Sequence, residues 1–135
     1  MVDVNYIAIF LGAIANMVVG MVWYGPLFGK PWMEMMGFNK KDMEKAKPNM
    51  GKTYLIAFIS ALVMSSVMAY IVDYAQAKDA VSGAQAGFWV WLGFLATSQL
   101  GMVLWEGKPW KLYGIYVAYY LVSLIIMGIV HAVLV

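Results

Sequence analysis

The sequence predicts an all-α fold, a bundle of four membrane-spanning helices. Four long uncharged runs cover residues 4–24, 54–72, 84–105 and 112–135, and nearly all charged residues lie in the short segments between them. Hydrophobic residues make up 64% of the chain and charged residues 12%, whereas soluble domains are roughly half apolar and about a quarter charged. A helix of about 20 apolar residues crosses a bilayer core and satisfies its own backbone polar groups. Each run is therefore long enough to span.

We place the four spans at about residues 4–24, 54–74, 84–105 and 112–133, within a single transmembrane domain covering residues 1–135. The first run follows Asp3 without a preceding basic segment, and it is longer than the apolar core of about 7–15 residues in a secretory signal. It is expected to be a retained span.

The lysines predict the orientation. Eight of the nine lie between the first two spans or after the third: Lys30, Lys40, Lys41, Lys45, Lys47, Lys52, Lys108 and Lys111. Only Lys78 falls in the remaining loop. Loops rich in Lys stay on the cytoplasmic side of a membrane. In the cell (inner) membrane, both termini are therefore expected on the outer side and loop 25–53 in the cytoplasm. Tryptophan prefers the headgroup layer, and the predicted cytoplasmic boundary holds Trp23, Lys30, Trp32, Trp105, Glu106, Lys108 and Trp110.

Two similar helical hairpins are predicted by an internal match. Residues 11–22 align with residues 92–103 without a gap and are identical at six of twelve positions, and Gly-Lys-Pro-Trp recurs at 29–32 and 107–110. Both copies would begin outside, so they would be parallel repeats. Apolar composition alone also produces chance matches, and this alternative stays open.

The first hairpin carries an insertion at about residues 33–51 that the second lacks. Gly37 is suited to ending one short helix, and Asn39 with Asp42 three residues later resembles the cap of another. Trp32, Met35, Met36 and Met43 would form an apolar stripe facing lipid. A short cytoplasmic interfacial helix is predicted, with a solvated loop as the alternative.

Three ordered strings carry a resemblance to a known family. They are Trp-Tyr-Gly-Pro-Leu-Phe-Gly-Lys at 23–30 followed by Trp32, Trp-Leu-Gly-Phe at 91–94, and Glu-Gly-Lys-Pro-Trp-Lys at 106–111. The chain resembles an uncharacterised bacterial membrane family, domain-of-unknown-function family 1761. The resemblance implies a four-span architecture and no established substrate or catalytic residue.

Polar and small residues within the spans are the candidate functional residues. A candidate polar layer in the membrane comprises Asn16, Thr97, Ser98, Gln99, Ser65, Ser66 and Ser123. Polar groups inside a membrane mark pathways in some proteins and helix contacts in others, and both alternatives stay open. Four glycines are candidates for helix packing. Gly12 and Gly20 each lie four residues from Asn16, and Gly93 and Gly101 each lie four residues from Thr97.

Isolated ionisable residues do not form a recognised reaction centre in the sequence. Glu106 is expected to pair with neighbouring lysines, and the lone His131 and Asp73 are expected to be solvated near the outer ends of their spans. The chain has no Cys and its basic residues are all Lys. We therefore predict no catalytic, cofactor or metal residues and no nucleic-acid partner. The methionines are read as fillers of apolar space rather than as copper ligands.

The sequence leads to two functional hypotheses. The first is a small channel- or transporter-like protein acting as a homo-oligomer, with an unidentified ion or small-molecule substrate. The alternative is a structural or accessory protein that recruits a partner through the Lys- and Met-rich loop. In both cases the lipid bilayer is the expected environment.

Overall fold

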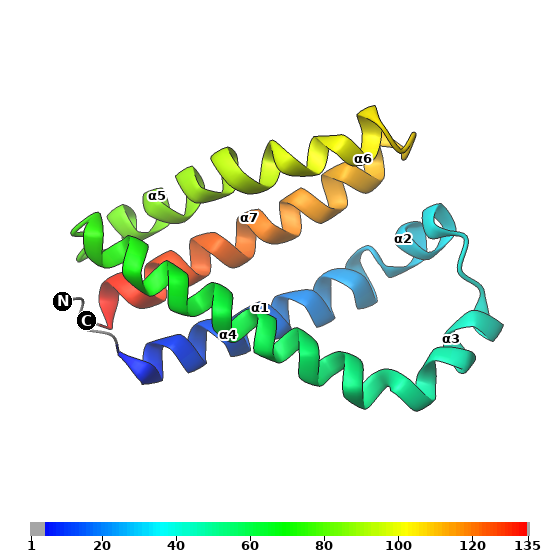
Figure 1. The fold of residues 1–135 in the computed structure, drawn as a ribbon, viewed down its shortest axis with the longest axis horizontal. Coiled ribbons are helices and arrows are strands. Elements are labelled where there is room, and N and C mark those ends of the chain that lie inside the picture. The colour runs from blue at the N-terminus through cyan, green and yellow to red at the C-terminus, as the bar shows by residue number, and fades with distance from the viewer. Residues whose placement is uncertain (1–4, 135) are drawn as a thin grey trace.

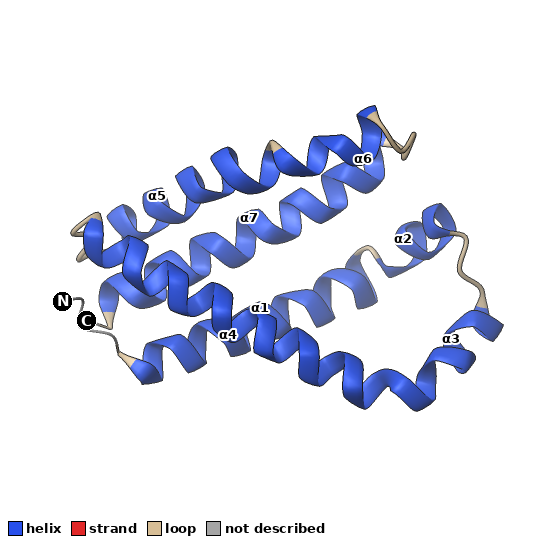
Figure 2. Ribbon diagram, in the orientation of Figure 1, coloured by secondary structure: helices blue, strands red, loops and turns tan. Residues whose placement is uncertain are grey.

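The computed structural model describes residues 5–134, apart from the side chains at 40, 43 and 46. Its elements in chain order are α1 (Tyr6–Val22), η1 (Trp23–Leu27), α2 (Gly29–Met36), α3 (Lys40–Ala46), η2 (Lys47–Asn49), α4 (Met50–Tyr74), α5 (Ala80–Val90), η3 (Trp91–Ala96), η4 (Ser98–Leu100), α6 (Gly101–Leu104) and α7 (Trp110–Val133). Over the described part of the chain every regular element is helical, and only loops join them (Figure 2).

Four continuous helical stretches are long and apolar enough to cross a membrane. They are Tyr6–Leu27, Lys47–Tyr74, Ala80–Leu104 and Trp110–Val133. Two of them begin several residues before the predicted spans do. The uncharged runs mark only the part suited to hydrocarbon, whereas backbone hydrogen bonding continues the helices through Lys47, Lys52 and Lys111.

The centre of the arrangement is α7, which lies against α1, α4 and α5 (Figure 1). Its most extensive contact is with α5, and α1 packs on both α4 and α7. The buried apolar core gathers Met68 and Val72 of α4 with Leu124 and Met127 of α7. Asn5 donates a hydrogen bond of 2.5 Å to the carbonyl of Leu134, which joins the start of α1 to the end of α7.

Glycine allows the contact between α5 and α7 to become very close. A Cβ atom at Gly87 would lie 2.7 Å from the carbonyl carbon of Leu124, and one at Gly83 would lie 2.7 Å from Ala132 Cβ and collide with the carbonyl oxygen of Gly128. Small residues are common where helices approach in lipid, because packing replaces the hydrophobic drive available in water. The Gly-x-x-x-Gly spacing at 83–87 was a signal for this contact that the sequence analysis did not use.

The two predicted hairpins are not packed equivalently. α1 has a large contact with α7, whereas α5 has only a small contact with α4. The π-helical turn η3 aligns, in the predicted repeat, with a regular part of α1, and the other π-helical turn, η1, follows the matched segment. The duplication therefore stays a prediction.

The predicted insertion contains two short helices, α2 and α3. Gly37 ends α2 in the left-handed conformation, with φ of 75°, and Asn39 caps α3 through reciprocal hydrogen bonds with Asp42. Two members of the predicted apolar stripe, Trp32 and Met36, contact α7, and the exposure of the stripe to lipid stays a prediction. The indole of Trp32 donates to the Tyr116 hydroxyl at 3.0 Å, and that hydroxyl contacts the sulfur of Met36 at 3.5 Å. A tyrosine on α7 offers the indole N–H a partner that lipid lacks, so α2 turns toward the bundle.

The contact between α5 and α7 gives a matched pair of variants. We expect Gly87→Ala to lower the free energy of unfolding by about 1–3 kcal/mol, because an added methyl group forces the two backbones apart. Gly93→Ala, in the following turn, should be neutral or slightly stabilising, since an added Cβ meets no described atom within 4 Å. Reversible unfolding in mixed micelles measures both. Equal losses of stability in the two variants would contradict the tight contact.

Candidate functional site

Four polar side chains are buried among the described residues of the bundle. They are Asn16 of α1, Ser65 of α4, and Ser123 and His131 of α7. Burying a polar group without a partner is costly in an apolar environment, so such groups are normally hydrogen-bonded. The hydrogen-bond partners of these four side chains therefore show which polar interactions the interior of the bundle provides.

His131 pairs with Ser65 deep inside the bundle. Its Nε2 atom lies 3.0 Å from the Ser65 hydroxyl, and the histidine is only 4% exposed. Either atom donates, according to the imidazole tautomer. The expectation of a solvated histidine was wrong. α4 and α7 pack against each other, and the serine supplies a hydrogen bond that water would otherwise provide.

Gly12 makes room for this pair. A Cβ atom at Gly12 would collide with the Ser65 hydroxyl and would lie 3.5 Å from Met127. The predicted packing glycine of α1 thus touches α4 and α7 at the polar pair itself. Gly20 similarly lies beside the hydroxyl of Tyr119, at 3.4 Å from an added Cβ.

Asn16 is bonded to Tyr119, which the sequence analysis did not single out. The tyrosine hydroxyl donates toward the Asn16 side-chain oxygen at 3.0 Å and lies 3.2 Å from the Asn16 backbone oxygen. The signal for Tyr119 was its helical spacing with Tyr116 and Ser123, which places the three on one side of α7.

Ser123 is the unusual member of the group. It is 1% exposed and lies near the Tyr119 hydroxyl, but among the described residues its own hydroxyl makes no hydrogen bond of ordinary distance and angle. Leaving such a group buried and unpaired costs about 1–3 kcal/mol. A buried group of this kind calls for an explanation in packing or in function.

These groups follow one another along α7. The pair Tyr119–Asn16 comes first, Ser123 follows, and the pair Ser65–His131 comes last. We call these groups together the polar line. From residue 119 to residue 131 a helix rises about 18 Å, which is more than half of a bilayer core of about 30 Å. Between Ser123 and His131 the line is interrupted at Met127, which is fully buried.

The other predicted members of the polar layer do not join the polar line. Thr97 donates to its own helix at the carbonyl of Gly93, at 2.7 Å, Ser98 donates to the carbonyl of Phe94, and Ser66 donates to the carbonyl of Leu62 at 2.7 Å. A hydroxyl bonded to the preceding turn is satisfied without any neighbouring helix. Thr97 and Ser98 are exposed and Gln99 is half-buried, so the equivalence of Asn16 and Thr97 in the predicted repeat does not extend to their surroundings.

Two of the predicted packing glycines have no helix against them within the described chain. An added Cβ at Gly93 meets open space, and one at Gly101 meets only Trp105, at 3.5 Å. The reason is the outer position of this span: only 6% of its most apolar 18-residue stretch is buried. Contacts of Gly93 and Gly101 with a second copy stay a prediction.

The predicted boundary residues divide into two groups. The Trp23 indole donates to the carbonyl of Ile115 at 2.9 Å, and Trp32 is bonded to Tyr116, so both attach their segments to α7. Trp105, Trp110, Lys30, Glu106 and Lys108 are exposed. Trp91, part of the Trp-Leu-Gly-Phe string at 91–94, donates to the carbonyl of Val117 at 2.7 Å and connects η3 to α7.

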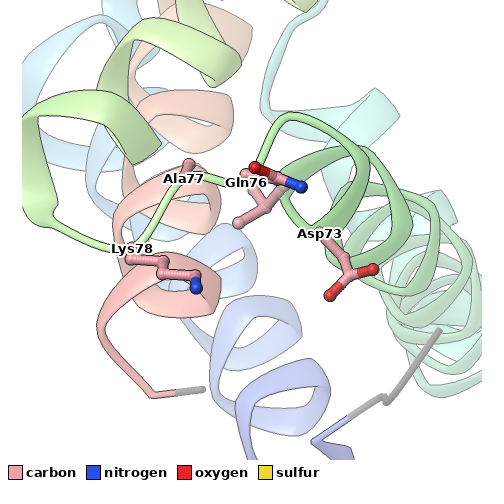
Figure 3. A pocket seen from close by; sticks show the side chains of 5 residues that line it. Asp73, Gln76, Ala77 and Lys78 are labelled. Atoms are coloured by element: carbon pink, nitrogen blue, oxygen red, sulfur yellow. The ribbon is translucent and has the colours of Figure 1, made fainter.

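The turn between α4 and α5 forms a small pocket of about 240 Å³ (Figure 3). Its lining includes Asp73, Gln76 and Lys78. In Figure 3 the side chains of Asp73 and Lys78 lie apart, Asp73 to the right of Gln76 and Lys78 to the left of it. Across the described residues, no group of three or more His, Asp or Glu side chains is placed to hold a metal ion.

Next to this turn, Asp79 caps α5. Hydrogen bonds from the Ser82 hydroxyl and the Ser82 backbone N–H hold the pKa of the Asp79 carboxyl below its usual value. The stabilisation from this cap is present above the pKa of the unfolded chain, and it is lost as the pH falls through the lower pKa of the folded state. Its role is therefore structural and persists at neutral pH.

Comparison with known proteins identifies a family and nothing further. The family described as protein of unknown function (DUF1761) matches residues 7–132. No curated protein and no solved structure matches the chain. The match covers all four long helices, so the polar line lies wholly within it.

Adjacent serines on α4 test the interior pair. We expect Ser65→Ala to lower the free energy of unfolding by about 1–3 kcal/mol, because His131 would lose its partner in a buried site. Ser66→Ala removes only a bond within one helix and should change stability by about 0.5 kcal/mol or less. Denaturant titration in micelles, followed by circular dichroism, measures both changes. A loss no larger at Ser65 than at Ser66 would remove the pair as a structural element.

Proposed function

The chain belongs to the family of proteins of unknown function designated DUF1761, and we propose that it is a small multi-pass membrane protein of channel- or transporter-like type. Its solute path follows the polar line, and the solute is a small, neutral, hydrogen-bonding molecule. The observation that carries this proposal is the unpaired hydroxyl of Ser123, buried between the pairs Tyr119–Asn16 and Ser65–His131.

The chemistry of the polar line supports a neutral solute. Its groups are hydroxyls, one amide and one imidazole, all of which offer hydrogen bonds without a fixed charge. A bare ion would need several such ligands at one level of the membrane, as selectivity filters provide. Here each level offers only one or two groups, which suits a molecule that carries little charge.

Met127 supplies the barrier expected in such a path. Its side chain is fully buried between Ser123 and His131, and methionine is flexible enough to change rotamer as a solute passes. Without a solute the path is therefore closed at the apolar side chain of Met127, which has polar groups on both sides.

Orientation and assembly are part of the same proposal. The lysine-rich end, with α2 and α3, lies in the cytoplasm, in keeping with the bias of basic residues toward that side. A homo-oligomer would cover the outer span Ala80–Leu104, which is little buried within one chain. The proposal gives the chain no catalytic role.

Replacing Ser123 separates transport from folding. We expect Ser123→Ala to be as stable as the natural chain or more stable, because it removes an unpaired buried hydroxyl. Its permeability to the transported solute should fall by about five-fold, the effect of one lost hydrogen bond. Stopped-flow light scattering of proteoliposomes with water, urea and glycerol measures the flux, and Ser66→Ala is the matched control.

Two outcomes of this experiment would count against a path. One is full permeability in the Ser123→Ala protein, which would leave the hydroxyl without a role in transport. The other is a natural protein whose proteoliposomes are no more permeable than empty ones to any of the three solutes.

A second function is favoured by the position of α3. This helix projects away from the four long helices (Figure 1), and its residues Lys41, Asp42, Glu44 and Lys45 are exposed. Its start is capped by reciprocal hydrogen bonds between Asn39 and Asp42. An accessory protein that recruits a partner through this helix is therefore the second proposal.

Charge reversal tests recruitment by α3. The double variant Lys41→Glu with Lys45→Glu should lower recovery of a co-purifying protein from native membranes by about ten-fold or more, because reversed charges repel an acidic partner surface. Unfolding of the four long helices should be unchanged. Lys108→Glu, at the other lysine-bearing turn, is the control. Equal recovery with all three proteins would reject the recruitment proposal.

A further inference from the structure

An aromatic chamber lies at the lysine-rich end of the bundle, apart from the polar line except at Tyr119. It is a cavity of about 500 Å³ between the end of the first span, α2, the start of α4 and the first half of α7. Residues that line it include Tyr24, Trp32, Met50, Tyr54, Tyr116 and Tyr120. We call this cavity the aromatic chamber.

Ring contacts hold the walls of the chamber in place. Tyr24 stands at their centre, with its ring centroid 5.4 Å from that of Trp32, 5.4 Å from that of Tyr119 and 6.0 Å from that of Tyr116. Edge-to-face and tilted pairs at such distances are favourable geometries for aromatic rings. The cavity is therefore bounded by fixed rings, a property of preformed binding sites.

The chamber presents hydrogen-bond donors that the protein does not use. Tyr116 and Tyr119 are engaged with Trp32 and Asn16. By contrast, no hydrogen bond to another described side chain or backbone group is found for the hydroxyls of Tyr24, Tyr54 and Tyr120. Free hydroxyls in an apolar wall suit a ligand that carries acceptor oxygens.

Lysines outnumber acidic residues in the sequence next to the lining of the chamber. The lining itself has no charged side chain, but among residues within three positions of a lining residue Lys30, Lys47 and Lys52 outnumber Glu34. A cationic ligand would be repelled by this excess, whereas an anionic group is attracted. The acceptor oxygens are therefore expected to belong to an anion.

An apolar groove continues from the chamber toward the middle of the spans. It runs between α1 and α4, shares Tyr24, Tyr54 and Tyr119 with the chamber, and passes Met17, Met21 and Ala57. Along both helices these apolar residues lie nearer the middle of the span than the tyrosines do. The polar-to-apolar order matches that of a lipid, with its headgroup at the membrane surface and its chains in the interior.

We infer that the aromatic chamber binds one anionic phospholipid of the surrounding bilayer. The headgroup phosphate accepts hydrogen bonds from the free tyrosine hydroxyls beneath the lysine-rich segment, and an acyl chain follows the groove between α1 and α4. This site goes beyond the proposed function, since it holds whether or not the polar line conducts a solute. Contact with Tyr119 places the lipid beside the first pair of the polar line.

Lipid titration with conservative variants tests the site. Native mass spectrometry of the detergent-purified protein, titrated with phosphatidylglycerol or phosphatidylcholine, should show one phosphatidylglycerol per chain, bound about ten-fold more tightly than phosphatidylcholine. The double variant Tyr24→Phe with Tyr120→Phe keeps both rings and removes both hydroxyls, and it should weaken phosphatidylglycerol binding by about ten-fold or more. Tyr74→Phe, an exposed tyrosine at the opposite end of α4, is the matched control and should keep the affinity of the natural chain.

A second variant distinguishes loss of lipid binding from misfolding. Thermal unfolding shows whether the double variant is intact, and Tyr54→Phe alone, at a half-exposed position, should weaken phosphatidylglycerol binding by about ten-fold with less risk to the fold. Equal affinity for the two lipids would overturn the inference. So would an unchanged affinity for phosphatidylglycerol in folded Tyr24→Phe with Tyr120→Phe and in Tyr54→Phe. Displacement of phosphatidylglycerol by equimolar oleate would reject a phospholipid as the occupant and assign the chamber to a free fatty-acid anion.

Discussion

The close packing of α7 against the other long helices is the constraint on which the rest of the structure depends. Gly83 and Gly87 bring the backbone of α5 onto α7, Trp23 and Trp91 donate hydrogen bonds to α7 carbonyls, and Asn16 and Ser65 bond to its side chains. Hydrocarbon offers no hydrophobic drive between apolar helices, so association relies on small residues and such hydrogen bonds. Displacement of α7 would therefore break the polar line and the aromatic chamber together.

Two kinds of polar environment are built on the same helix. Toward its beginning, α7 contributes Tyr116 and Tyr120 to the aromatic chamber, which is lined mainly by tyrosine and tryptophan rings. Further along, Ser123 and His131 are sealed from solvent, where only neutral groups are retained at modest cost. Tyr119 belongs to both environments. This position explains how a lipid in the chamber and a solute in the polar line would influence each other through one hydroxyl.

The outer span behaves differently from the inner three. Between Ala80 and Leu104 the helix is regular along α5, changes to a π-helical turn at Trp91–Ala96, and leaves the hydroxyls of Thr97 and Ser98 bonded to its own backbone. Only its first half, with Gly83 and Gly87, is fitted closely to α7. The predicted sequence repeat compares this span with α1, but α1 has neighbours on two sides and this span has essentially one.

Local sequence determined the helices and their ends. Uncharged runs defined four long helices because a backbone in lipid has to satisfy its own hydrogen bonds, and Gly37, Asn39 and Asp42 determined where α2 stops and α3 starts because caps act within a few residues. The tertiary structure alone decided which polar residues meet. Asn16 and Thr97 have similar sequence contexts, yet one is bonded to Tyr119 and the other to its own helix. Likewise Ser65 meets His131, while the adjacent Ser66 faces away from it. Which face of a helix is covered depends on its rotation and on its neighbours, and a nearly uniform apolar sequence contains little information about either.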